Sequence, residues 1–341
     1  MEKNRCINFF KGIACLGVIL LHCNCVNDQT MNFLKSIARF AVPFFLMVSG
    51  YFLYSDDRKT RIKRLKKQFL KILKLTFIIC TIYFLWNFKK LDFNLFGIVN
   101  WFKEFLLNPA LTKQILLFNR WFFLASTVYY LFMLIYVYII DYVATKLHLD
   151  KVLYIGSIAL ITLGLYTQYT NVNNLEWYYW GNWLFAGLAF FEFGSFLAWM
   201  KSKDELKCNV IFNIFLFILG FVGCAVTVII KRTFFYYDIG AVLIATSALV
   251  FSINHPKWYI LKPIEILGEK YSLDIFMLHI IIRDIVEQYR FETEIVYSYK
   301  WILLIILGSV LFGILVRTAI DLMKKLINFI ETKFEKKKSH T

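Results

Sequence analysis

The sequence predicts an all-α, polytopic integral membrane protein, a single bundle of about ten transmembrane helices that occupies residues 1–341. Hydrophobic residues make up 59% of the chain, and Phe alone occurs 36 times. Soluble domains hold only about 45–50% apolar residues. The apolar residues also gather in runs near the length of about 20 residues that a spanning helix needs. Between these runs, no stretch is long enough to form a separate soluble domain.

Ten runs are apolar and long enough to be spanning helices. The first keeps Lys11 and His22 and lacks a convincing cleavage site, so we expect it to remain as a helix rather than act as a signal peptide. The eighth is short and ends at the helix-breaking Asn254-His255-Pro256. In chain order the predicted spans are 6–26, 37–55, 69–88, 120–143, 151–168, 179–200, 209–230, 238–254, 271–288 and 300–323.

Charge sets the expected orientation. The segment RKTRIKRLKK, residues 58–67, holds seven basic residues and no acidic one, and we interpret it as a cytoplasmic loop. An even number of helices then places both termini in the cytoplasm, and a basic cytoplasmic tail at 324–341 agrees with this. Such segments account for the net charge of +16, so we expect membrane lipids and no nucleic acid as partners. The seven cysteines show no CxxC pair, and we expect no metal site.

The longest connection between predicted spans is 89–119. Within it, residues 98–118 repeat apolar side chains at helical spacing. We expect an amphipathic segment at the outer membrane interface. It serves either as a plain covering loop or as a lid over a site that faces outward.

Lys11 and His22 interrupt the first apolar run and lie eleven positions apart. At about 100° per residue, eleven steps return to nearly the same face of a helix, about 16 Å further along its axis. Ionisable side chains within a span usually face the bundle interior or a wet cavity. One helix face would then join the two membrane sides, with Lys11 near the cytoplasm and His22 near the exterior. Alternatively, Lys11 only extends to the interface and His22 only satisfies a carbonyl or water.

These residues sit in motifs that resemble a known family. INFFKGIACLGVILLH (7–22) and ARFAVPFFLMVSGYF (38–52) resemble the opening of the membrane acyltransferase-3 family. That family has an Arg or Lys, ten residues and a His in its first helix, then Phe-Phe and Ser-Gly-Tyr or Ser-Gly-Phe in its second. NRWFFLASTVYYL (119–131) and GEKYSLDIFMLHIII (268–282) are weaker likenesses to its middle and late segments.

The resemblance implies a bacterial cell-membrane enzyme that takes an acyl group, often acetyl, from cytoplasmic acyl-CoA. The acceptor is a hydroxyl of a surface carbohydrate or lipid-linked glycan. It also implies that His22 is catalytic and that Lys11 contacts the donor. An imidazole suits this task because it can accept the hydroxyl proton near neutral pH. We expect no permanently bound cofactor, with acyl-CoA acting as a donor substrate.

Other residues have candidate roles. Arg58 and Arg61 are candidates, with Lys11, for binding the CoA phosphates. His279 is a candidate donor contact or a packing residue, and Arg39 either orients the acceptor or anchors the interface. Glu192 lies within a span and either orients the histidine as a catalytic partner or forms a structural polar clasp. Trp121, in the middle likeness, is a candidate acceptor contact, and we interpret the Ser49-Gly50 pair as a packing element.

Two functions from different classes therefore stand. The first is O-acyl transfer, with acetyl favoured, onto an envelope glycan. The second is a carrier for a small molecule such as serine, because the first motif also resembles the membrane modules fused to amino-acid racemases. An enzyme requires the chemistry of His22, whereas a carrier requires a binding pocket and would tolerate its loss.

Overall fold

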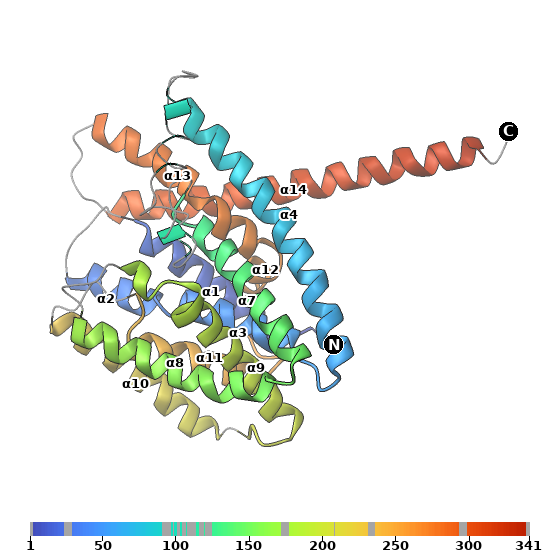
Figure 1. Ribbon diagram of the computed structural model, residues 1–341. Helices are drawn as coiled ribbons and strands as arrows, with labels where there is room; N and C mark the ends of the chain where they lie inside the picture. The colour runs from blue at the N-terminus through green and yellow to red at the C-terminus, as the bar shows by residue number, and fades with distance from the viewer. Residues whose placement is uncertain are drawn as a thin grey trace.

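A computed structural model shows a bundle of helices, with no strand among the residues that it describes (Figure 1). The predicted all-α membrane fold class is confirmed, since seven helical segments within the described residues are long and apolar enough to cross a membrane. Besides a few single positions between 97 and 119, the structure describes 3–23, 29–90, 125–171, 177–207, 209–230, 236–292 and 299–338.

The helices follow the predicted runs closely. Each of the ten runs contains a helix, although α1 and α11 are shorter than the seven candidate spans. In chain order the elements are α1 (Arg5–Leu21), α2 (Gln29–Ala38), α3 (Ala41–Leu53), α4 (Arg58–Lys90), α7 (Val128–Lys146), α8 (Asp150–Asn171), η1 (Trp177–Tyr179), η2 (Trp183–Leu188), α9 (Ala189–Ser202), α10 (Val210–Ile229), α11 (Ile239–Asn254), α12 (Lys262–Ile266), η3 (Leu267–Tyr271), α13 (Ser272–Glu292) and α14 (Tyr299–Lys338).

The start of α4 corrects one prediction. The basic segment 58–67 is not a loop but the first third of this 33-residue helix. The segment Arg58–Lys90 contains neither Gly nor Pro, so nothing in it breaks a helix. Asp57 caps the helix by accepting hydrogen bonds from the backbone N–H of Thr60 at 2.9 Å and from its hydroxyl at 2.5 Å.

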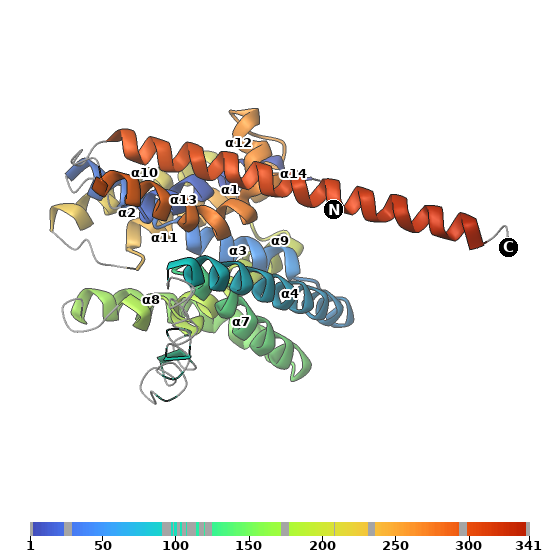
Figure 2. The same ribbon diagram turned by 90° about the horizontal axis from the view of Figure 1, so that it is seen from above.

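The last helix also differs from expectation. The predicted tail 324–341 begins inside α14, which continues as a helix to Lys338. In both views the C-terminal part of α14 extends well beyond the other helices (Figures 1 and 2). The expected cytoplasmic tail is therefore, for most of its length, an extension of a spanning helix.

The second run is longer and broken. The apolar helical segment covers Gln29–Leu53, eight residues upstream of the predicted start, and is interrupted at Arg39 and Phe40 between α2 and α3. Pro43 lies in the first turn of α3, where its missing N–H costs no hydrogen bond. The interruption places Arg39 at a turn between two helices. The predicted amphipathic segment 98–118 lies, apart from isolated positions, outside the described residues.

Close helix contacts hold α1 and α3 at the centre of the bundle. α3 packs most extensively against α9. A side chain at Gly50 would collide with the Phe191 carbonyl, and one at Gly194 would collide with the Met47 carbonyl. Gly50 therefore serves packing, because the absence of a Cβ lets the two backbones meet. α1 contacts α2, α3, α12 and α13, which surrounds the face that bears Lys11 and His22.

Candidate active site

A cavity of about 320 Å³ lies among α1, α3, the start of α7 and α13. We call it the histidine cavity. Its polar and charged lining includes His22, Arg39, Ser126 and Thr127, and aliphatic side chains and aromatic rings form the rest. The full lining is Val18, Leu21, His22, Arg39, Val42, Ser126, Thr127, Tyr129, Tyr236 and Phe276.

Two imidazoles meet at this cavity. The ring centroids of His22, at the end of α1, and His279, in α13, lie 5.2 Å apart. The Nδ1 atom of His22 lies 3.5 Å from the Ser126 hydroxyl. His22 lines the cavity, whereas His279 is 1% exposed and lies behind it. The fold therefore brings together two histidines that lie 257 positions apart in the sequence.

Backbone contacts determine which nitrogen of His279 carries a proton. Its Nδ1 atom lies 2.9 Å from the Phe276 carbonyl oxygen and 3.2 Å from the Ile275 carbonyl oxygen. Carbonyls only accept, so Nδ1 is the donor. Nε2 is buried and has no hydrogen-bond partner in the described part of the chain. Because an unpaired lone pair is cheaper to bury than a charge, the neutral ring with a free Nε2 lone pair fits this site best.

Arg39 brings a fixed cation to the same cavity. One of its Nη atoms lies 3.9 Å from a carboxylate oxygen of Asp238, and the Ser36 hydroxyl donates to that same oxygen at 2.6 Å. Asp238 also caps α11 through the N–H of Ala241 at 2.7 Å. The Asp238 carboxylate thus fixes the position of Arg39, whose side chain lines the cavity.

A second cavity, also of about 320 Å³, adjoins the other end of the α1 face. We call it the lysine cavity. Lys11 and Lys71 give it two cations, and Gln68 and Ser49 add neutral polar groups. Its full lining is Lys11, Phe45, Val48, Ser49, Phe52, Leu53, Gln68, Lys71, Ile72, Tyr130, Leu134, Tyr138, Ser272, Leu273 and Phe276. Phe276 lines both cavities, so the Lys11–His22 face opens onto two neighbouring spaces.

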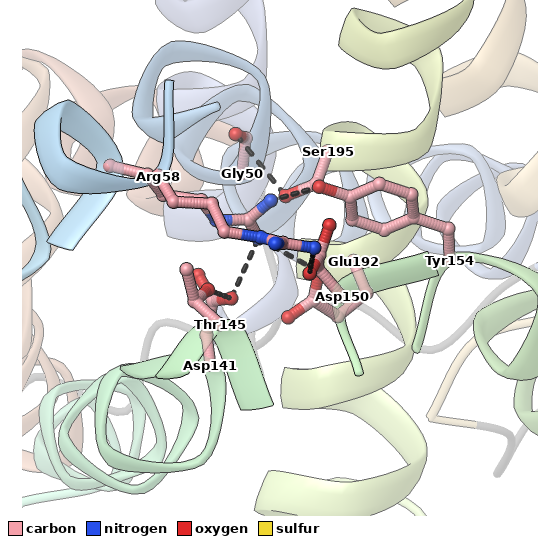
Figure 3. A network of polar contacts seen from close by, with 9 residues as sticks. Gly50, Arg58, Asp141, Thr145, Asp150, Tyr154, Glu192 and Ser195 are labelled. Carbon is pink, nitrogen blue, oxygen red and sulfur yellow. Dashed lines mark hydrogen bonds and ion pairs between the residues drawn. The ribbon is translucent and has the colours of Figure 1, made fainter. Parts of the chain in front are cut away.

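A separate buried cluster forms around Arg61, and Figure 3 labels its members Asp141, Tyr154 and Glu192. Its guanidinium lies 2.6 Å from Asp141 and 3.4 Å from Glu192, and it contacts the Tyr154 hydroxyl. Arg61 is 2% exposed, and both carboxylates are fully buried. The members come from α4, α7, α8 and α9, so the cluster ties four helices together. We call it the arginine cluster.

A family model described as an acyltransferase domain, acyltransferase family 3, matches residues 4–318. The chain belongs to this family. The match covers nearly all of the helical bundle, and it confirms the resemblance seen in the first two motifs. No curated protein and no solved structure matches the chain.

In this membrane acyltransferase, some of the predicted site residues line the two cavities and others lie elsewhere. Lys11 lines the lysine cavity, whereas His22 and Arg39 line the histidine cavity. His279 lies beside His22 rather than among the residues of the lysine cavity. Trp121 lies outside the described residues.

Arg58, Arg61 and Glu192 line neither of the two cavities. Arg61 is too buried to bind CoA phosphates, and Glu192 contacts Arg61 rather than His22, which favours the structural clasp. Arg58 bonds to Asp150 at 3.3 Å and contacts His148, and it lines neither cavity. The burial of Arg61 therefore argues against its expected role in donor binding, whereas a donor contact for Arg58, whose side chain is 41% exposed, stays a prediction.

Sequence reasoning missed Ser126, Gln68, Lys71 and Phe276. For α4 a periodic pattern was available, because its buried side chains lie three, four or seven positions apart, which keeps them on one helix face. They are Arg61, Leu65, Ile72, Thr76, Ile79 and Tyr83. If the helix is extended back to Arg58, this row of buried side chains includes Arg61, whose side chain then points into the bundle. No comparable pattern marks Ser126, which precedes α7, or Phe276, one of 36 phenylalanines.

Proposed function

We propose that this acyltransferase moves an acyl group, with acetyl favoured, from cytoplasmic acyl-CoA onto a hydroxyl of an envelope carbohydrate or lipid-linked glycan. The observation that carries the proposal is the pair of adjacent cavities along one face of α1. One contains two lysines, and the other contains an imidazole pair. Donor and acceptor can thus approach from opposite ends of one face.

The lysine cavity suits the donor. The CoA phosphates are anions, which Lys11 and Lys71 attract, and Gln68 can exchange hydrogen bonds with the amides of the pantetheine arm. With the basic start of α4 in the cytoplasm, this cavity lies toward the cytoplasmic side. The histidine cavity then lies toward the exterior, where an envelope glycan is available.

The histidine cavity suits the chemistry. A hydroxyl attacks the thioester carbon well only if its proton is accepted as the new C–O bond forms. His22 is the proposed base, since its ring lines the cavity. When the C–S bond breaks, the imidazolium returns the proton to the departing CoA sulfur, so the reaction yields an ester and a free thiol. Arg39 can stabilise the negative oxygen of the tetrahedral intermediate.

His279 is proposed as a positioning residue. Its proton is committed to the α13 backbone, so its Nε2 atom can accept but not donate. An acceptor beside His22 favours the protonated His22 ring that forms during the reaction. Ser126, on the other side of His22, fixes the ring orientation through its hydroxyl.

The test uses the purified full-length chain in vesicles. Acetyl-CoA with a labelled acetyl group is supplied to the lysine-cavity side alone, and a lipid-linked oligosaccharide is present in the membrane. The proposal predicts label on the saccharide in an ester that mild base removes. Saturable serine flux without acyl-CoA, and no ester, would contradict it in favour of the carrier.

A further inference from the structure

Phe276 occupies the junction between the two cavities. Its side chain is 4% exposed and lines both of them. On α13 it lies between Ser272 and Leu273, which line the lysine cavity, and His279, which pairs with His22. Its ring therefore lies on the path from Lys11 to His22 along this face.

Two other rings hold Phe276 in place. The Tyr130 ring centroid lies 4.9 Å from that of Phe276, and the Phe45 centroid lies 5.7 Å away in an edge-on arrangement. These rings come from α7 and α3 and line the lysine cavity. Three helices therefore each contribute one aromatic ring to an apolar partition between two cavities that carry charged groups.

We infer that the Phe276 side chain is the partition through which the acyl group passes, and that it sets the largest acyl chain that the enzyme accepts. This inference rests on the proposed function. The acyl group is the leading end of the pantetheine arm, so it crosses first and must fit past the ring. An acetyl group requires a small displacement of Phe276, whereas each further methylene requires a larger one.

The side chain can be changed without removing the support of the histidines. His279 bonds to the backbone carbonyl of Phe276, which every substitution retains. Phe276→Leu and Phe276→Ala therefore widen the junction, and Phe276→Trp narrows it. In each variant the Nδ1–H of His279 still donates to the carbonyl of residue 276. Phe276→Leu is the milder change and guards against loss of folding in the alanine variant.

The first experiment compares kcat/KM for acetyl-, butyryl- and hexanoyl-CoA. For Phe276→Ala the butyryl-to-acetyl ratio should rise roughly tenfold or more, with a smaller rise for Phe276→Leu, since one or two methylenes in a tight apolar site shift specificity by about that much. Phe276→Trp should lower the ratio. The matched control is Phe190→Leu, because Phe190 is fully buried against Tyr237 and lines neither cavity. Its ratio should equal that of the wild type.

A second experiment does not depend on acyl transfer. In a cysteine-free background, Val42→Cys places a thiol in the histidine cavity. A small membrane-impermeant thiol reagent, added from the lysine-cavity side alone, should label it slowly with Phe276 present and several-fold faster with Phe276→Ala or Phe276→Leu.

The outcomes separate the two proposals. Active Phe276 variants with an unchanged chain-length ratio would overturn the inference and leave the proposed function intact. A wild type that transfers no acyl group would overturn the proposed function, and the labelling rates would still decide whether Phe276 separates the cavities. Equal labelling with and without the Phe276 ring would overturn the partition.

Discussion

Two buried groups of ionisable side chains differ in one instructive way. In the arginine cluster, Arg61 faces Asp141 and Glu192 at 2.6 and 3.4 Å, and none of the three lines either cavity. In the histidine pair, His22 lines a cavity, and the Nε2 atom of His279 has no hydrogen-bond partner among the described residues. Both groups are costly to bury in a membrane. The difference is that one is closed by ion pairs between helices, whereas the other leaves space for a substrate.

Arg61→Ala should have the largest effect on stability. It leaves two buried carboxylates without their cation, which costs about 3–5 kcal/mol. The yield of folded protein and the melting temperature in detergent should fall, and activity should fall with them. Glu192→Gln is the matched control, because one neutralised carboxylate still leaves the Arg61–Asp141 pair. A normal melting temperature for Arg61→Ala would show that the cluster does not hold the four helices.

His279→Gln should have the opposite effect, with a loss of acyl transfer and no loss of stability. The amide can still donate to the α13 carbonyls, but it lacks the basic nitrogen beside His22. Transfer should fall about a hundredfold, near the lower end of what a proton-transfer partner contributes. The melting temperature should stay near that of the wild type, and the pH–rate profile should move. If the rate falls but the pH–rate profile keeps its shape, His279 has only a packing role.

The contrast also explains what the sequence could predict. The apolar runs determine the helices, and the eleven-residue spacing of Lys11 and His22 determines their common face, because both depend on local periodicity. The direction in which Arg61 points depends on where α4 begins. A basic segment hides that start, since positive charge at a membrane boundary is compatible with a loop or a helix.

Contacts between helices that are distant in the sequence could not be predicted from local sequence patterns. The pairing of His279 with His22 and of Glu192 with Arg61 arises from which helices pack together, not from spacing within any one of them. The same holds for Phe276, whose importance comes from having a cavity on either side. A single sequence offers many apolar rings and no means to select this one.

Lys71→Ala and Lys11→Ala should weaken donor binding without unfolding the bundle. Each removes one cation from the lysine cavity, and KM for acetyl-CoA should rise about fivefold to tenfold, equivalent to about 1–1.4 kcal/mol. The rise should shrink at high salt. Lys74→Ala is the matched control, since Lys74 is exposed on the same helix and lines neither cavity. An equal effect for all three variants would contradict a specific donor site.

The smallest effect concerns the cap of the helix that carries Arg61. Hydrogen bonds from the hydroxyl of Thr60, and then from its backbone N–H, hold the pKa of Asp57 below its ordinary value of 3.8. The stabilisation is therefore present above that value and is lost as the pH falls through the lower folded pKa. The difference in melting temperature between wild type and Asp57→Ala should shrink in strong acid. A difference that stays constant from neutral to acidic pH would exclude the ionised cap.

The most direct measurement is acyl transfer by His22→Gln, made on vesicles in which the same preparation is also melted. Our account predicts that transfer from acetyl-CoA drops at least a hundredfold, because no other group that lines the histidine cavity can take the hydroxyl proton as readily near neutral pH. The melting temperature should match the wild type. Transfer at the wild-type rate by a folded His22→Gln protein would contradict the central role of this histidine.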